Sequence, residues 1–240
     1  MGQADGIPPG EGYPEAFARI QAAVDAGDTD LSRLGFWRLV GRLKLDPAAA
    51  HAWADRAGRI DRAAFEARVR PLFPVWLGNL VLVIGVVFGA AAVAYGLRTD
   101  TPTLAGLAFV VAGGAWSLSI HDLAHWAAGR LSDIRFLAYF FGGPFPPRPG
   151  LKIDYGTYLL AAPGARARMH AAGALATKIA PFVALGFALG AGGPLWAILV
   201  LIGMGVFEIA TDILFSTKAS DWKRVRRERA VARALAVANR

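Results

Sequence analysis

Two histidines and an aspartate interrupt an apolar stretch in the middle of the chain. They stand as His121-Asp122-Leu123-Ala124-His125, at the end of an apolar run that starts at Leu104. A charged group at membrane depth costs about 2.5 to 3.5 kcal/mol on insertion scales, so such residues are usually functional or paired. On a helix, His121 and His125 lie one turn apart on one face and can share one ion. The spacing therefore predicts a metal site.

An open metal site of this kind needs a third protein ligand, with water in the fourth position. The chain contains no Cys, so the ligand must be His, Asp or Glu. Glu208 and Asp212 lie one turn apart in a later apolar run, and Asp221 follows just after it. The residues by themselves leave all three acidic groups as alternatives.

The composition indicates what must hold these residues in place. Hydrophobic residues make up 55% of the chain, and the mean hydropathy is +0.40. Apolar runs close to 20 residues long are typical of membrane-spanning helices. We therefore expect an all-α, polytopic membrane protein with four spans, at about 75–96, 104–128, 171–190 and 193–215. Between the second and third spans lies a polar section, in which the alternation of Leu151 to Tyr155 predicts a short strand.

The region before the first span has a different character. Residues 1–13 lack periodicity and are expected to be disordered. A helical pattern follows to about Leu72, with one helix capped by Asp30 and carrying Leu31 to Leu43, and a second that begins at Asp46-Pro47. Arginines on these helices fit either an amphipathic segment on an anionic leaflet or a solvated helical hairpin. The narrow apolar stripes favour the hairpin, with His51 as a surface residue.

The positive charges predict the topology. Lys and Arg outside the spans number 10 before the first span, then 1, 6 and 0 in the three loops, and 8 after the fourth span. The positive-inside rule then places both termini in the cytoplasm, with His121 roughly 12 Å deep in the inner leaflet. The expected domains are a cytoplasmic helical region 1–74, a membrane domain 75–216 and a basic cytoplasmic tail 217–240.

The net charge of +8 also bears on partners and compartment. The charges collect beside apolar runs, which argues against nucleic acid and for membrane lipid as a partner. Arg greatly outnumbers Lys and Ala and Gly are abundant, as in GC-rich bacterial genomes, so we expect a bacterial inner membrane. The sequence carries no signal for the oligomeric state.

The chain resembles the intramembrane zinc metalloproteases of the site-2 protease type. His121 to His125 is similar to the H-E-x-x-H motif of that family, and 129–136 to the segment after it. Ala171 to Thr177 looks like its A-A-G-P-L-A-N stretch, and Asp212 to Asp221 like the segment that ends in its L-D-G aspartate. The resemblance covers about Ser117 to Arg227, under half of the chain, and the first motif is the most specific.

The resemblance implies an activity and a ligand set. Zinc would be held by His121, His125 and Asp221, with Asp212 as the runner-up for the third ligand. Asp122 would act as the general base in hydrolysis of a peptide bond within or next to a membrane segment of a protein or peptide substrate. Thr177 would support the site, with Leu151 to Tyr155 as a strand that pairs with unwound substrate.

Four positions depart from the family pattern: Asp122 for Glu, Ala174 for Pro, Thr177 for Asn and Trp222 for Gly. Asp122 matters most, because its carboxylate is one methylene shorter than that of the family's base. Thr177 keeps a hydroxyl but lacks the amide donor of Asn.

These departures leave rival interpretations. The first is a catalytically silent relative that serves as a membrane scaffold or binding subunit, and the second is a cation transporter with a route lined by His121, Asp122, Glu208 and Asp212. The histidines could also join helices by hydrogen bonds, with Asp122 paired to Lys178 or Arg130. Glu208 and Asp212 could form a buried polar pair. For His170 we expect an interfacial position rather than a ligand role.

Overall fold

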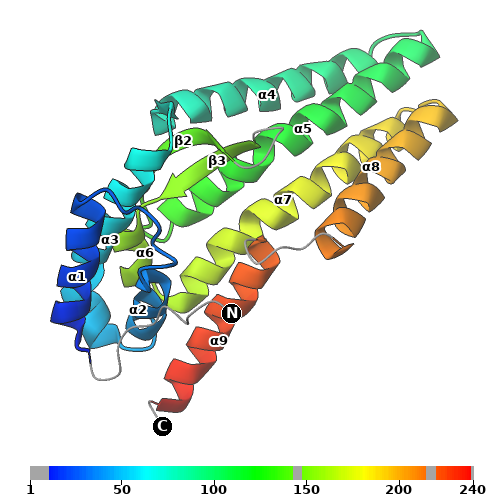
Figure 1. Ribbon diagram of the computed structural model, residues 1–240. Helices are drawn as coiled ribbons and strands as arrows, with labels where there is room; N and C mark the ends of the chain where they lie inside the picture. The colour runs from blue at the N-terminus through cyan, green and yellow to red at the C-terminus, as the bar shows by residue number, and fades with distance from the viewer. Residues whose placement is uncertain (1–10, 143–147, 215–219, 239–240) are drawn as a thin grey trace. The chain divides into compact units, whose positions relative to one another are not determined.

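The computed structural model describes residues 11–142, 148–214 and 220–238 (Figure 1). Most of these residues are helical, as expected. They form two compact units: a sheet unit of Met1–Val75, Arg130–Arg166 and Glu228–Arg240, and a bundle unit of Trp76–Gly129 and Ala167–Arg227. The expected boundaries after residues 74 and 216 concern placement relative to a membrane and stay a prediction.

The helices of the sheet unit share one apolar core. They are α1 (Tyr13–Asp25), α2 (Phe36–Leu43), α3 (Pro47–Arg68) and the short α6 (Tyr155–Leu160). Phe17, Phe36 and Ile60, from three different helices, are fully buried together. A helix lying on a leaflet would need its apolar face open to lipid. The shared core therefore favours the solvated helical arrangement, and His51 is exposed, as expected.

Capping residues set where these helices begin. The Asp46 carboxylate accepts a hydrogen bond from the Ala49 amide at 2.9 Å, so α3 starts at Pro47 as predicted. The helix predicted from Leu31 was wrong in its first part. Gly35 has a positive φ of 80°, so α2 begins only at Phe36, after a set of turns. Helix α1 begins at Tyr13, one residue before the helical pattern expected after residue 13, and residues 1–10 of the expected disordered segment lie outside the described residues.

Three short strands complete the sheet unit. They are β1 (Leu72–Phe73), β2 (Phe136–Gly142) and β3 (Arg148–Ile153), antiparallel in the order β1-β2-β3. The strand expected at Leu151 to Tyr155 therefore exists but ends earlier, because the Asp154 carboxylate accepts a hydrogen bond from Gly156 and caps α6. Strand β3 lies at one edge of the sheet.

The bundle unit contains four helices that are long and apolar enough to cross a membrane. They are α4 (Val75–Gly96), α5 (Pro102–Arg130), α7 (Pro163–Gly190) and α8 (Leu195–Leu214). Helix α4 coincides with its prediction, whereas α7 begins well before Ala171, because Pro163 starts a helix that continues through Arg166 and Arg168. The expected end of the last span, Phe215, lies outside the described residues. The first residues of α9 (Asp221–Ala238) also belong to this unit.

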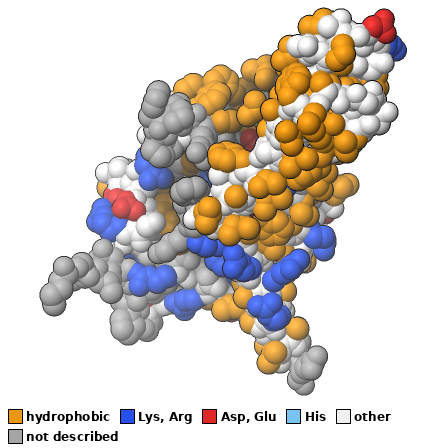
Figure 2. Space-filling model, turned by 90° about the vertical axis from the view of Figure 1, so that its right-hand side faces the viewer, with side chains coloured by type: hydrophobic (Ala, Val, Ile, Leu, Met, Phe, Trp, Pro, Cys, Tyr) orange, Lys and Arg blue, Asp and Glu red, His pale blue; other side chains and the backbone are white. Residues whose placement is uncertain are grey.

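Small residues let the bundle helices approach closely. A Cβ built on Gly113 of α5 would lie 2.8 Å from a methyl carbon of Leu201 of α8, so the glycine lets this leucine pack against the α5 backbone. Ala112, Ala184 and Ala188 are buried in the same core. The outward faces instead expose large apolar side chains such as Val87 and Phe207, and Figure 2 shows an extensive hydrophobic surface. Exposure of such an apolar surface to water would be unfavourable, whereas contact with lipid suits it.

Candidate metal centre

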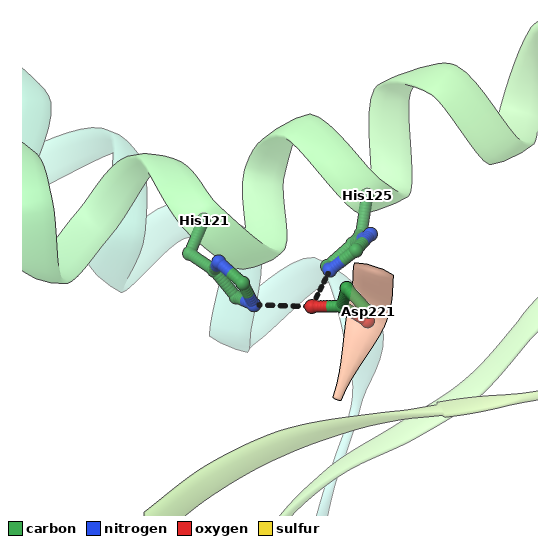
Figure 3. Close-up of side chains that lie close together, drawn as sticks. All are labelled: His121, His125 and Asp221. Atoms are coloured by element: carbon green, nitrogen blue, oxygen red, sulfur yellow. Dashed lines mark hydrogen bonds and ion pairs between the residues drawn. The ribbon is translucent and has the colours of Figure 1, made fainter. Parts of the chain in front are cut away.

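Helix α5 presents both histidines to the same point. His121 and His125 are one turn apart, and their ring centroids are separated by 4.6 Å. The Nε2 atoms of both rings face the Oδ2 atom of Asp221, at 3.5 Å from His121 and 3.3 Å from His125 (Figure 3). The three ligand atoms all lie within 4.8 Å of one another. The structure thus brings together the three residues that the sequence pointed to.

The second nitrogen of each ring is held by an oxygen of α7. His121 Nδ1 lies 2.8 Å from the Thr177 hydroxyl, which donates its own proton to the Gly173 carbonyl at 3.0 Å. His125 Nδ1 lies 2.8 Å from the Met169 carbonyl, which can only accept. With the Nδ1 protons donated to these two oxygens, the Nε2 atoms of the neutral rings can serve as metal ligands. Thr177, expected to support the site, orients a ring.

The third group, Asp221, is the first residue of α9. An acidic group is favoured there by the helix dipole. Burial opposes its ionisation, but the contacts with His125 and His170 hold the pKa of Asp221 well below its ordinary value. The carboxylate is therefore negative at neutral pH. Its Oδ2 atom lies within reach of both Nε2 atoms, 3.3 Å from that of His125 and 3.5 Å from that of His121.

This donor set fits a metal ion. Imidazole nitrogen and carboxylate oxygen both bind first-row divalent ions. Two atoms that each lie about 2.1 Å from a tetrahedral ion are about 3.4 Å apart, close to the spacing of the Asp221 oxygen from each imidazole nitrogen. The cluster of His121, His125 and Asp221 can therefore hold a metal ion.

Gly173 of α7 makes room for the site. A Cβ built on this residue would collide with the His125 ring. The imidazole therefore lies directly against the α7 backbone, where it reaches the Met169 carbonyl. A side chain at position 173 would displace the ring, which explains the glycine at the third position of the Ala171 to Thr177 stretch.

Asp122 lies beside the cluster but is not one of the three residues that form it. Within the described part of the chain, its carboxylate makes no hydrogen bond or ion pair, although it interacts electrostatically with His121, His125 and Asp221. Of the two pairings considered for it, the one with Lys178 was wrong, because Lys178 pairs with Asp212.

The other two acidic candidates for the third ligand lie apart from the cluster. The Asp212 carboxylate forms an ion pair of 2.7 Å with Lys178. Glu208 has Ser117 and Lys178 as its electrostatic neighbours. The pairing of Glu208 with Asp212 that the sequence allowed is not among the described contacts, and Lys178 lies near both carboxylates instead.

His170 is the site residue that the sequence did not identify. Its side chain is only 3% exposed, and Nδ1 lies 3.5 Å from the Asp221 Oδ1 atom. The expected position of His170 at a membrane interface stays a prediction, but α7 starts early enough to place this histidine beside Asp221. The sequence did offer one signal for this position. His170 lies four residues before Ala174 of the A-A-G stretch, and residues four apart share a helix face.

The bundle unit contains an apolar pocket of about 270 Å³. Its lining includes Ile120, which precedes His121, and Ala176, which precedes Thr177. Helices α4, α5 and α7 all contribute, through side chains that carry no charge: Val86, Ala90, Trp116, Ile120, Ala176, Ile179, Ala180 and Val183.

Comparisons of the chain with protein-family models, with curated proteins and with solved structures give no match.

Proposed function

We propose that the chain is an intramembrane zinc metalloprotease of the site-2 protease type. One observation carries the proposal: two imidazole nitrogens and a carboxylate oxygen converge within an apolar helical unit. This is the donor set of an open metal site. Zinc accepts two His and one carboxylate in four-coordinate sites with one open position, and the family resemblance favours it over other ions.

The protein's own residues divide the work in this proposal. His121, His125 and Asp221 hold the ion, and the Thr177 hydroxyl and the Met169 carbonyl fix the ring tautomers. When bound, zinc supplies Lewis acidity that polarises a carbonyl and makes water a nucleophile near neutral pH. Asp122 accepts the proton that the attacking water gives up, because its carboxylate is near the cluster and has no other described partner.

A catalytically silent relative is the second candidate, and the length of the Asp122 side chain favours it. A carboxylate one methylene short of the family's base can miss the proton that it should accept. Such a protein would keep the ion and serve as a membrane scaffold or binding subunit. We do not propose a cation transporter, because Lys178 neutralises Asp212, one of the residues that would line the route.

The proposal places the four apolar helices across a bacterial inner membrane with both termini in the cytoplasm. The distribution of Lys and Arg supports this orientation. Reporter fusions after Asp100 and after Gly192 should then report the periplasm, whereas fusions at Pro149 and at the C-terminus report the cytoplasm. A periplasmic signal at Pro149 would overturn the orientation and the location of the site in the inner leaflet.

The proposed substrate is a membrane segment of a protein or peptide, cleaved within or next to the bilayer. The apolar pocket of the bundle unit suits hydrophobic side chains of such a segment. The edge position of β3 supports recognition of unwound backbone, since an edge strand has hydrogen-bonding groups free for another strand.

Cleavage assays with Asp122 variants test the proposal. Purified protein is reconstituted in liposomes with a panel of helical membrane peptides. We expect slow cleavage by the wild type, none by Asp122→Asn, whose amide cannot accept a proton, and equal or faster cleavage by Asp122→Glu. Cleavage undiminished in Asp122→Asn would eliminate Asp122 as the base. Absence of cleavage by every variant, including Asp122→Glu, would favour the silent relative.

A further inference from the structure

The position of Asp221, the proposed third ligand, depends on how one end of a helix is held. Asp221 is the first residue of α9, whereas His121 and His125 lie inside α5. A side chain within a helix is placed by the helix around it, but a first residue is placed by whatever holds that helix end. The contacts of the first turn of α9 therefore decide whether the Asp221 carboxylate reaches the two histidines.

His170 provides the first of these contacts. The two oxygens of Asp221 are used differently: Oδ2 faces His121 and His125, while Oδ1 faces His170 Nδ1 at 3.5 Å. Arg224, on the next turn of α9, lies 3.7 Å from the same Oδ1 atom. Because Oδ1 is engaged by these two basic side chains, Oδ2 alone is left for an ion. His170 is buried, so its hold on the carboxylate is little weakened by water.

Lys178 provides the second contact, two turns further along α7. Its ammonium forms an ion pair with Asp212 of α8 and donates to the Ala174 carbonyl at 3.2 Å. It also lies 5.9 Å from the centre of the ring of Trp222, the residue after Asp221. A cation over an indole face is attracted to it. Lys178 thus connects α7 with the end of α8 and with the first turn of α9.

We propose that His170 and Lys178 are positioning residues, which together hold the first turn of α9 so that Asp221 offers one oxygen to the metal ion. The inference rests on the proposed metal centre. It assigns Asp212 a role as well: as the anchor of Lys178 rather than as a ligand. Helix α7 then serves the site along its whole inner face, through His170, Thr177 and Lys178.

A purely structural role for these residues predicts a different outcome. Loss of a buried contact would then lower the thermal stability without changing how tightly the ion is bound. Metal affinity separates the two cases, because groups that orient a ligand typically alter affinity 10- to 100-fold when removed.

The experiment measures Zn²⁺ dissociation constants by chelator competition and the visible absorption of the Co²⁺-loaded protein. We expect His170→Phe and Lys178→Met each to weaken Zn²⁺ binding about 10- to 100-fold and to alter the Co²⁺ spectrum. Lys178→Arg, which keeps the cation, should restore most of the affinity. Affinities of His170→Phe and Lys178→Met within twofold of the wild type would overturn the inference.

Two matched controls exclude general destabilisation. Lys152→Met removes a lysine from another buried ion pair, that with Asp61 in the sheet unit, and His51→Gln replaces an exposed histidine. Both should retain wild-type Zn²⁺ affinity and Co²⁺ absorption. An equal loss of affinity in Lys152→Met would overturn the inference. If the wild type itself binds no Zn²⁺ or Co²⁺, both the proposed function and this inference fail. Tight binding in all variants overturns this inference alone.

Discussion

The buried acidic groups of the sheet unit and of the metal cluster differ in what they face. In the sheet unit, Asp61 pairs with Lys152 at 2.5 Å, and Glu228 pairs with both Lys44 and Arg166. Each carboxylate there meets a fixed cation of the protein. In the cluster of the bundle unit, the Asp221 Oδ2 atom meets only the Nε2 atoms of two histidines among its described partners.

The difference separates a structural network from a binding site. A buried charge is costly unless it is paired, and the pairs of the sheet unit are complete within the chain. The Tyr158 hydroxyl even adds a hydrogen bond to Glu228 at 3.0 Å. The Asp221 carboxylate pairs with Arg224 through Oδ1, while its Oδ2 atom belongs to a donor set that could hold a metal ion. Acidic groups therefore serve stability in one unit and, in our proposal, metal binding in the other.

The largest effect is expected from Asp221 and Asp212 of the bundle unit. In our proposal Asp221 binds a metal ion, whereas Asp212 pairs with a lysine of the protein. Asp221→Asn should weaken Zn²⁺ binding at least 100-fold, because it removes a charged ligand. Asp212→Asn should weaken it far less, through Lys178 only, while lowering the free energy of unfolding by about 2 kcal/mol. Chelator competition and thermal unfolding measure the two quantities. The opposite ranking of affinities would move the ligand assignment to Asp212.

A smaller effect, on stability alone, is expected in the sheet unit. Asp61→Asn leaves Lys152 buried without its partner and should lower the free energy of unfolding by about 3 kcal/mol, with Zn²⁺ affinity unchanged. Glu66→Gln is the control, because its pair with Arg62 is exposed and should contribute less than about 1 kcal/mol. If Asp61→Asn released the metal ion, the separation between structural and metal-binding carboxylates would be lost.

The smallest effect is expected on how the stability contributed by Glu228 changes with pH. Burial disfavours the charged form of Glu228, but Lys44 and Arg166 outweigh it and lower its pKa below the ordinary value of about 4.3. The contribution of this group to stability is present above the ordinary pKa. It is lost as the pH falls toward the lowered pKa, because the unfolded chain takes up a proton that the folded chain refuses.

Glu228→Gln therefore tests this sign. The variant should be less stable at pH 7 and should show a shallower loss of stability below about pH 4.3 than the wild type. Thermal unfolding between pH 3 and 7 provides the measurement. A variant with the same pH slope as the wild type would show that Glu228 is not the group responsible.

The sequence predicted the features that depend on local spacing. The four apolar helices follow from run length alone, and α4 was placed correctly at both ends. The one-turn spacing of His121 and His125 predicted that their rings share a face, which the structure confirms. The cap at Asp46 likewise depends on neighbouring residues only.

Features that depend on distant contacts could not be predicted in this way. Strand β2 is an apolar run with no alternation, and its register is set by β1 and β3. His170 is a lone histidine near a helix start, and only the position of Asp221, 51 residues later, gives it a partner. The choice of Asp221 over Asp212 rested on the family resemblance, since Lys178, which binds Asp212, could equally have paired with Asp122.

The metal content of the purified chain tests the central claim most directly. Elemental analysis of protein purified without chelators should find about one zinc per chain, and the double variant His121→Ala His125→Ala should have lost it. Its thermal unfolding compared with that of His51→Gln checks that the double variant is folded. Less than about a tenth of an equivalent of any transition metal in the wild type, with none regained on adding Zn²⁺, would contradict the account.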